Sequence, residues 1–460
     1  MTQQVKKKLN DSWGMRWGAL AIVAFTMMAA YYVNDVVAPL KSMLEASPSE
    51  NGLGWTSSDF GIYTGAYSFL NVFCLMLIWG GLILDRFGIR FTGKLATILM
   101  VVGTWLEYYA MTTMVGTADM ILGYKADVFV ASAGYSVFGV GAEVAGITVT
   151  KMIAKWFRGK EMATAMGVQV ALARVGSQAA YAVAIPVARS FELTTPVLIG
   201  LVCLVGGMIA FFSFSVLDKK LDTQMEEIKD ESSDDEKFSF KDVATILSNP
   251  GFWLIALLCV LFYSCVFPFQ KFASELMMTP KYGIDENVAG FFAGLPALGA
   301  LILTPVFGGM VDKRGKAASI MMFGAAMLIF VHFIYALPFI KGPYIAIGLM
   351  IILGIAFSLV PSAMWPSVAK IFPAHQLGTA YALIFFIQNI GLWGVPTLIG
   401  FVLDNYCITG KTESGTNLYD YTVPMCIFTG FAVLSLVVAF ALKIADRKFG
   451  YKLEESNIKK

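Results

Sequence analysis

Hydrophobic residues along the chain gather in twelve runs that are each long enough to cross a lipid bilayer. A helix needs about 20 mostly apolar residues to span the bilayer core. The runs cover residues 17–40, 59–84, 92–116, 124–150, 162–188, 195–217, 251–276, 287–311, 317–339, 343–371, 378–401 and 422–446. They lack the alternating segments of about 10 residues that mark barrel strands, and backbone polar groups in lipid must be paired within the spanning segment. We therefore predict an all-α membrane protein with twelve transmembrane helices.

One long charged segment divides these runs into two groups of six. It covers residues 218–250 and carries the acidic run DESSDDE near its centre. We predict a six-helix half at 1–217, a cytoplasmic central loop at 218–250 and a second six-helix half at 251–460. The loop is either a regulatory or partner-binding segment or a solvated connector, and we favour the connector. Its last part, FSFKDVATIL, is typical of a short amphipathic helix on the inner membrane surface.

Lys and Arg are unevenly distributed between the loops on the two sides of the membrane. With the N-terminus in the cytoplasm, the loops on its side carry the clusters around Arg86, Lys151 and Lys313, whereas the opposite loops carry few basic residues. Cytoplasmic loops are the ones enriched in Lys and Arg. We predict that both termini are cytoplasmic. The short loops, without a recognisable lysosomal sorting signal, favour a bacterial inner membrane.

The composition agrees with a membrane protein and narrows the class of function. Of the 460 residues 57% are hydrophobic and 14% are charged, and the mean hydropathy is +0.69. The net charge is +2, so we expect no nucleic-acid partner. The six cysteines and two histidines have no spacing typical of a disulfide or metal site, so we expect neither a metal nor another cofactor. The sequence has no Gly-x-Ser-x-Gly elbow, HExxH motif or phosphate-binding loop, which argues against an enzyme.

A short motif occurs at matching positions in the two halves. GLILDRFGIR follows the second run and GGMVDKRGK follows the eighth, and in both a glycine lies four residues before the aspartate and another three residues after it. The candidate gating residues are Gly81, Asp85, Arg86, Gly88 and Arg90 in the first copy and Asp312, Lys313 and Gly315 in the second. Duplicated elements are typical of transporters built from repeats. We expect the glycines to let the second and eleventh helices approach closely, and Asp85 with its basic neighbours to hold an inward gate.

The first copy resembles the hallmark loop of the major facilitator superfamily, whose members are transporters. Three further stretches resemble one branch, the lysosomal dipeptide transporters and their bacterial relatives: KWFRGKEMATAMGVQVALARVGS, CVFPFQKF and FPAHQLGTAYALIFFIQNIG. The resemblance implies a secondary transporter or facilitator that moves dipeptides or similar zwitterions by alternating access. A more distant likeness to nitrate and organic-anion porters, in the WF-x-GKE part, keeps an anion porter as the alternative. Proton-coupled members carry an arginine in helix 4 where this chain has Tyr135, so the resemblance does not imply proton coupling.

Two ionisable residues well inside the predicted helices are the main candidates for a substrate site. Glu143 lies in GVGAEVAG and Arg174 in VALARVGS. A charge at the bilayer centre costs at least about 2.5–3.5 kcal/mol on insertion scales, so charges that are kept there indicate function. We expect Glu143 to bind a substrate ammonium and Arg174 a substrate carboxylate. The resemblance places a binding acid and arginine at these same two positions. The alternative, a simple ion pair between them, is compatible with a gate in the same carrier.

Several other residues are weaker candidates. Asp35, in the outer part of the first run, is the next candidate for binding or gating. The remaining candidates for the cavity lining are Tyr67, Asn71, Tyr263, Phe267, Trp365, Gln388 and Asn389. We expect Glu107 and Lys271 to be peripheral and to extend toward the membrane surface. The expected partners are a small-molecule substrate and the lipid bilayer, for a monomer or homodimer with or without an accessory subunit.

Overall fold

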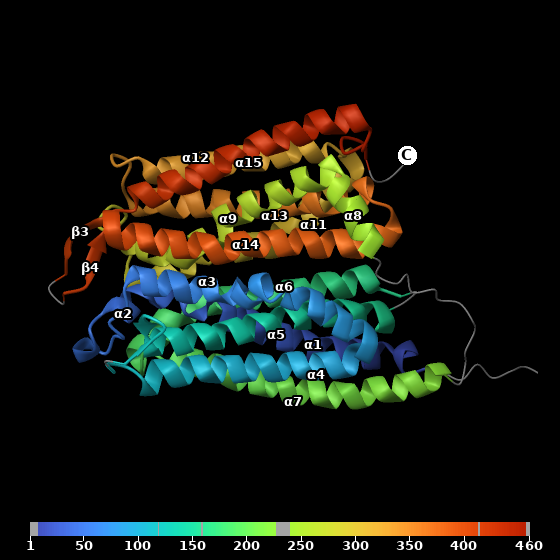
Figure 1. The fold of residues 1–460 in the computed structure, drawn as a ribbon, viewed down its shortest axis with the longest axis horizontal. Helices are drawn as coiled ribbons and strands as arrows, with labels where there is room; N and C mark the ends of the chain where they lie inside the picture. Colours follow the sequence, from blue (N-terminus) through green and yellow to red (C-terminus); the bar gives the residue numbers. More distant parts are fainter. Residues whose placement is uncertain (1–7, 118, 158–159, 227–239, 413–414, 457–460) are drawn as a thin grey trace, which may run out of the picture.

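The chain folds into a bundle of long helices, shown in Figure 1. The computed structural model describes residues 8–117, 119–157, 160–226, 240–412 and 415–456. Within these ranges, eleven helices are long and apolar enough to cross a membrane. The α-helices are α1 (Trp13–Val36), α2 (Lys41–Glu45), α3 (Ser57–Phe73), α4 (Met76–Thr113), α5 (Ala126–Trp156), α6 (Met162–Ser190), α7 (Thr195–Glu226), α8 (Phe240–Ser248), α9 (Pro250–Met278), α10 (Glu286–Ala293), α11 (Leu295–Arg314), α12 (Ala317–Ala336), α13 (Pro343–Ile371), α14 (Ala374–Tyr406) and α15 (Thr422–Phe449).

The one predicted crossing that is missing from these eleven is the second, at 59–84, and it is made of two pieces. Helix α3 ends at Phe73, and α4 begins after Leu75, whose backbone is left-handed with a φ of 53°. A second break lies inside α4 at Gly88, where φ is 76° and ψ is 177°, a conformation that glycine adopts at little cost. The part of α4 before Gly88 completes the second crossing, and the part after it forms the third. The structure therefore agrees with the predicted twelve-helix fold, with two crossings joined in α4.

The helices form two halves that lie side by side in Figure 1. Helices α1 and α3–α7 belong to the first half, and α9–α15 belong to the second. The halves contact each other chiefly where α3 packs against α14 and where α6 packs against α10 and α11. Of these facing helices, α3, α6, α11 and α14 also line the central cavity.

The segment between the halves differs in part from the predicted connector. Helix α7 continues to Glu226, beyond the boundary at 217 that the hydrophobic pattern indicates. Helix α8 confirms the predicted short helix before the second half. The acidic run DESSDDE lies outside the described residues.

The two ends of the bundle carry different loops. One end, the terminal end, holds the start of α1, helix α8 and the last described residues, whereas the other, the hairpin end, holds α2 and two small β-hairpins (Figure 1). In one hairpin β1 (Met120–Ile121) pairs with β2 (Tyr124–Lys125), and in the other β3 (Ile408–Lys411) pairs with β4 (Asn417–Tyr419). The sequence did not predict these hairpins, because strands this short show no period-two pattern.

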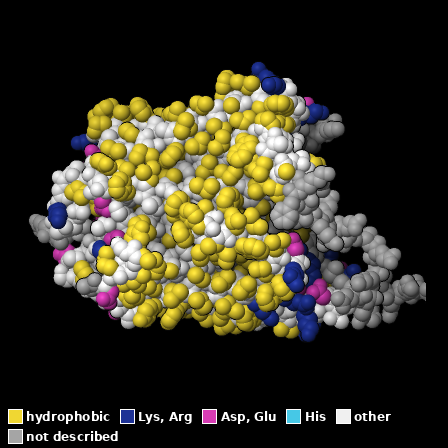
Figure 2. All heavy atoms as spheres, viewed as in Figure 1, with side chains coloured by type: hydrophobic (Ala, Val, Ile, Leu, Met, Phe, Trp, Pro, Cys, Tyr) yellow, Lys and Arg dark blue, Asp and Glu magenta, His cyan; other side chains and the backbone are white. Residues whose placement is uncertain are grey.

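Hydrophobic side chains cover the flank of the bundle between its ends. Figure 2 shows this broad apolar band, with Lys and Arg gathered mainly at the terminal end. Large apolar residues of the long helices are unusually exposed, among them Val202 at 63% and Ile209 at 60% on α7 and Phe440 at 53% on α15. An apolar surface of this extent is expected where a protein contacts lipid acyl chains.

Candidate functional site

A cavity of about 500 Å³ lies between the two halves. Helices α1, α3, α5 and α6 supply one wall, and α9, α11, α13 and α14 supply the other. The sequence-predicted residues that line it are Asp35, Tyr67, Glu143, Arg174, Tyr263, Phe267, Trp365 and Gln388. Asn71 and Asn389 do not line it, and their exposed fractions are only 1% and 2%. A cavity shared by both halves is where a carrier built from repeats binds its substrate.

Glu143 lies on α5 among small residues that leave room beside its carboxylate. Ala142 and Gly146, one residue before and three after it, line the same cavity. Its Oε1 atom accepts a hydrogen bond from the Tyr67 hydroxyl on α3, at 3.1 Å. Among the described residues, no lysine or arginine forms an ion pair with this carboxylate. The Glu143 carboxyl group thus faces the cavity, and in the described part of the chain its hydrogen bond comes from a hydroxyl group rather than from a cation.

Arg174 lies on α6 and contacts aromatic rings from both halves. Its guanidinium carbon is 5.5 Å from the ring centre of Tyr31 on α1 and 5.0 Å from that of Phe357 on α13. Such cation–π contacts hold the guanidinium without using its N–H donors. In the described part of the chain it forms no ion pair, either with Glu143 or with another acid. The alternative of a closed Glu143–Arg174 ion pair is therefore not formed in this conformation.

Asp35 and Lys271 form an ion pair at the cavity, which corrects the expectation that Lys271 is peripheral. The Lys271 ammonium is 3.0 Å from Asp35 Oδ1 and also donates to the backbone carbonyl of Asn34, at 2.6 Å. The Tyr135 hydroxyl donates to the same carbonyl, at 2.7 Å. Lys271 belongs to α9 and Asp35 to α1, so this pair joins the two halves. The Lys271 side chain is only 11% exposed, because its ammonium points to a carboxylate within the protein.

Glu107 is also not peripheral, which is a second correction. Its side chain is fully buried in α4, and its Oε1 atom accepts a hydrogen bond from the Tyr63 hydroxyl at 2.5 Å. The Tyr63 ring stacks on the Tyr135 ring, with centres 4.8 Å apart. Glu107 does not line the cavity itself. It holds Tyr63, whose ring packs on Tyr135, and Tyr135 lines the cavity.

Hydrogen bonds between neighbouring helices of the second half hold its polar side chains at the cavity. The Trp365 indole donates to the Tyr263 hydroxyl at 3.2 Å, and the Cys259 thiol donates to Gln388 Oε1 at 3.3 Å. The neighbouring Asn389 instead donates to the Phe385 carbonyl of its own helix, at 2.9 Å. Adjacent residues on a helix point about 100° apart, and here Gln388 faces the cavity whereas Asn389 is turned toward its own helix.

The first copy of the gating motif lies on α4 at the terminal end. Asp85 pairs with Lys151 of α5 at 2.8 Å, and Arg90 pairs with Asp222 of α7 at 3.4 Å. The Arg86 guanidinium lies over the ring of Phe87, 5.5 Å from its centre. A Cβ atom placed on Gly81 would meet nothing within 4 Å. The expected close approach of another helix is therefore absent at this glycine in this conformation.

The second copy lies at the end of α11. Asp312 and Lys313 occupy its last turn, and Gly315 ends the helix with a left-handed φ of 66°. A Cβ on Gly315 would lie 2.5 Å from the backbone of Glu455, so the chain's C-terminal segment packs directly on this turn. Both copies of the motif therefore contact partners within their own half.

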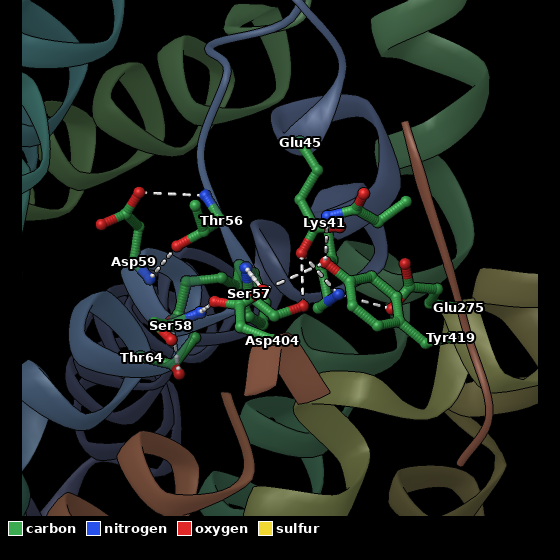
Figure 3. Close-up of polar contacts among 12 residues, drawn as sticks. Lys41, Glu45, Thr56, Ser57, Ser58, Asp59, Thr64, Glu275, Asp404 and Tyr419 are labelled. Carbon is green, nitrogen blue, oxygen red and sulfur yellow. Dashed lines mark hydrogen bonds and ion pairs between the residues drawn. The ribbon is translucent and has the colours of Figure 1, made fainter. Parts of the chain in front are cut away.

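At the hairpin end, a cluster of buried charges joins the halves, as Figure 3 shows. The Lys41 ammonium, on α2, is 2.6 Å from Glu45 Oε1 and 2.6 Å from Glu275 Oε2 of α9. Lys41 is only 1% exposed. The Tyr421 hydroxyl donates to Glu275, and burial, with the nearby Glu275 carboxylate, raises the pKa of Tyr421 well above its ordinary value. The tyrosine therefore stays protonated and remains a donor.

A second contact at this end joins α3 to α14 (Figure 3). The Asp404 carboxylate, on α14, accepts hydrogen bonds from the backbone N–H groups of Ser57 and Ser58, at 3.1 and 2.5 Å. These are the first residues of α3, where unpaired N–H groups attract a negative charge. An acid of the second half thus caps a helix of the first half.

Close helix packing completes the closure at the hairpin end. A Cβ on Gly61 of α3 would lie 2.5 Å from the Pro396 carbonyl of α14, and a Cβ on Gly400 would lie 2.2 Å from the Ser57 carbonyl. Only glycine lets the two backbones come this near. The close approach predicted for the second and eleventh helices is therefore formed, but by different glycines and at the opposite end.

Known proteins similar to this chain are transporters. The family model for the Major Facilitator Superfamily matches residues 20–396. The human lysosomal dipeptide transporter MFSD1 is 29% identical over 399 residues, which cover 84% of this chain and 79% of that protein. A crystal structure of the nucleoside transporter NupG matches with a TM-score of 0.70 at 12% identity, covering 92% of this chain and 98% of that one. A crystal structure of a peptide transporter, POT, in complex with alafosfalin matches with a TM-score of 0.69 at 14% identity, covering 97% and 96%. The protein is a multi-pass membrane transporter and belongs to the Major Facilitator Superfamily.

Proposed function

We propose that this transporter carries dipeptides or similar small zwitterions by alternating access. One observation carries the proposal: Glu143 and Arg174 line the same cavity, and neither has an ionic partner among the described residues. Charges kept inside a membrane protein are costly unless they are paired. A ligand that brings one ammonium and one carboxylate pairs both of them at once.

Each end of such a ligand has a suitable group to bind. The substrate ammonium binds Glu143, whose Oε1 accepts the Tyr67 hydroxyl and whose other oxygen is left for the ligand. The substrate carboxylate binds Arg174, whose planar fork donates two parallel hydrogen bonds to a carboxylate. A hydrogen bond to a charged group contributes about 1.5–3 kcal/mol. Loss of either end should therefore weaken binding about tenfold to a hundredfold.

Similarity to known proteins supports the same substrate class. The relative MFSD1 is named as a lysosomal dipeptide transporter, and it aligns with most of this chain. An anion porter is expected to bind its substrate with cationic groups in the cavity and without an acid beside them. The Glu143 carboxylate in the cavity therefore favours a zwitterion over nitrate or an organic anion.

The proposal includes an orientation and a membrane. The gathering of Lys and Arg at the terminal end supports a cytoplasmic location for that end and for both termini (Figure 2). Closure at the hairpin end then makes this conformation inward-facing, with substrate released to the cytoplasm or taken from it. The other conformation forms when the halves rock about the cavity, so that the hairpin end opens. We place the protein in a bacterial inner membrane, as its short loops suggest.

Ligand-induced thermal stabilisation of the purified protein tests the substrate class. A ligand at 100 times its Kd stabilises the folded state by about 2.7 kcal/mol. The ligands are Ala-Ala, its N-acetylated and its C-amidated forms, nitrate and succinate. We expect Ala-Ala to stabilise the wild type, and each blocked form to do so only at about tenfold or higher concentration, because each lacks one charged end.

Two variants test which residue binds the substrate ammonium and which binds its carboxylate, and a third variant is the control. Glu143→Gln should lose its preference for a free ammonium, and Arg174→Gln its preference for a free carboxylate. Glu50→Gln removes an exposed carboxylate at the hairpin end and should behave as the wild type. Stabilisation by nitrate or succinate without any effect of Ala-Ala would refute the dipeptide proposal and favour the anion porter.

A further inference from the structure

The two walls of the central cavity differ in chemistry. Three of its charged lining residues, Asp35, Glu143 and Arg174, come from the first half. The second half contributes Lys271, whose ammonium is already bound to Asp35 at 3.0 Å. The groups with unused charge therefore all lie on the first half. If the substrate binds by its charged ends, its uncharged parts face the second half.

The second half presents a nearly continuous surface of aromatic rings to the cavity. We call it the aromatic wall, and it consists of Tyr263, Phe267, Phe357, Trp365 and Phe385. The rings of Tyr263 and Phe267 are stacked, with centres 5.4 Å apart, and Phe267 meets Phe357 edge to face at 5.3 Å. Trp365 stacks on Phe385 at 4.8 Å and is 6.5 Å from Tyr263. The rings thus form one connected surface.

Contacts among these residues leave ring faces and edges for a ligand. The Trp365 N–H is used by the Tyr263 hydroxyl, so these two polar groups satisfy each other. Phe385 keeps 36% of its surface exposed while it lines the cavity. Aromatic pairs gain from edge-to-face and offset contacts with further rings. The wall is therefore suited to an aromatic or large apolar group.

The position of Arg174 decides which part of a dipeptide meets this wall. Its guanidinium carbon lies 5.0 Å from the ring centre of Phe357, a member of the wall. A carboxylate bound to Arg174 is bonded directly to the Cα atom that carries the C-terminal side chain. The N-terminal side chain lies beyond the peptide bond, and in an extended dipeptide it points to the opposite side.

We propose that the aromatic wall selects dipeptides by their C-terminal side chain and favours an aromatic one there. This inference rests on the proposed function, because it requires the carboxylate to bind Arg174. Burying a phenylalanine rather than an alanine side chain on the wall strengthens binding roughly tenfold to a hundredfold. The N-terminal side chain contributes less, so two dipeptides of the same composition bind differently.

Ala-Phe and Phe-Ala provide the test, because they have the same atoms, charge and apolar area. Their Kd values, with that of Ala-Ala, are measured by thermal stabilisation of the purified protein. We expect Ala-Phe to bind roughly tenfold or more tightly than Phe-Ala. In Phe385→Leu, which keeps an apolar side chain but removes a ring, the ratio of the two Kd values should fall toward one. Phe401→Leu, on the same helix but outside the cavity lining, is the matched control and should keep the wild-type ratio.

The outcomes separate this inference from the function on which it rests. Equal affinity for Ala-Phe and Phe-Ala, or a preference for Phe-Ala, would overturn the selection by the wall while leaving a zwitterion site in place. An unchanged ratio in Phe385→Leu would overturn the part assigned to that ring. If none of the three dipeptides binds, the substrate class itself is wrong.

Discussion

The hairpin end and the terminal end of the bundle both carry clustered charges, but the clusters differ in what they join. At the hairpin end the Lys41 ammonium, 1% exposed, connects the first half to Glu275 of the second. At the terminal end Lys151 and Asp85, with side chains 42% and 68% exposed, connect two helices of the same half. Arg16 of α1 pairs with Glu161, the residue before α6 of the same half, at 2.9 Å. The same residue types therefore lock the halves at one end and strengthen a single half at the other.

Burial decides how much each kind of ion pair contributes to the free energy of the conformation that forms it. An exposed pair contributes about 0–1 kcal/mol, because water screens it. Removal of one partner from a buried pair costs about 3–5 kcal/mol, because the remaining charge is left without solvent or partner. The conformational equilibrium should therefore respond to substitutions at the hairpin end and scarcely to equivalent ones at the terminal end. Distances between spin labels on exposed Ser49 and Thr409, one in each half at the hairpin end, can report that equilibrium.

The largest effect is expected for Lys41→Met. The substitution leaves Glu45 and Glu275 facing each other in a buried site, which raises the free energy of the closed conformation by about 3–5 kcal/mol. The Ser49–Thr409 distance distribution should shift to longer distances as the hairpin end opens. Lys151→Met is the matched control and should leave the distribution unchanged. An unchanged distribution in Lys41→Met would mean that the cluster does not hold the halves together.

An intermediate effect is expected for Gly61→Ala. The new Cβ would lie 2.5 Å from the Pro396 carbonyl, so α3 and α14 must separate, at a cost of about 1–3 kcal/mol. The label distances should lengthen again. The comparison is with Gly81→Ala, where a Cβ meets nothing within 4 Å in this conformation. If both variants open the hairpin end equally, the packing at Gly61 is not what closes it.

The smallest effect is expected for Asp404→Asn. The side chain keeps its shape and an acceptor oxygen, but it loses the negative charge that faces the N-terminus of α3. A charge at a helix terminus contributes about 0.3–1 kcal/mol. We expect a small rise in the open population, measured with the same labels and relative to Glu50→Gln. A response as large as that of Lys41→Met would show that Asp404, rather than Lys41, is the main lock.

The sequence predicted most of the fold, because lipid imposes strong constraints on a spanning segment. Each crossing needs about 20 apolar residues in a helix, and all twelve were found by that criterion. The break at Leu75 was not found, since it lies within apolar sequence that reads as continuous, whereas the bend at Gly88 falls in the charged segment between the second and third predicted runs. Local backbone breaks depend on packing against other helices, which a hydropathy pattern does not contain.

The candidate site was predicted in part for a related reason. Glu143 and Arg174 stand out because few ionisable residues lie deep in the spans, and both line the cavity. Lys271 was missed because its position near the end of a span suggested an exposed side chain. Its partner Asp35 lies far away in sequence, on the first helix of the other half. One available signal was that the first helix of each half carries an ionisable residue at similar depth and of opposite charge.

Transport by the purified protein in liposomes tests the central claim most directly. Liposomes loaded with Ala-Ala are mixed with labelled Ala-Ala, and uptake is measured for the wild type, Glu143→Gln and Glu50→Gln. We predict exchange by the wild type and by Glu50→Gln, competition by free dipeptides at concentrations about tenfold or more below those needed for the N-acetylated or amidated forms, and much weaker exchange by Glu143→Gln. Exchange by Glu143→Gln at the wild-type rate, or equal competition by the blocked forms, would contradict a site that recognises both charged ends.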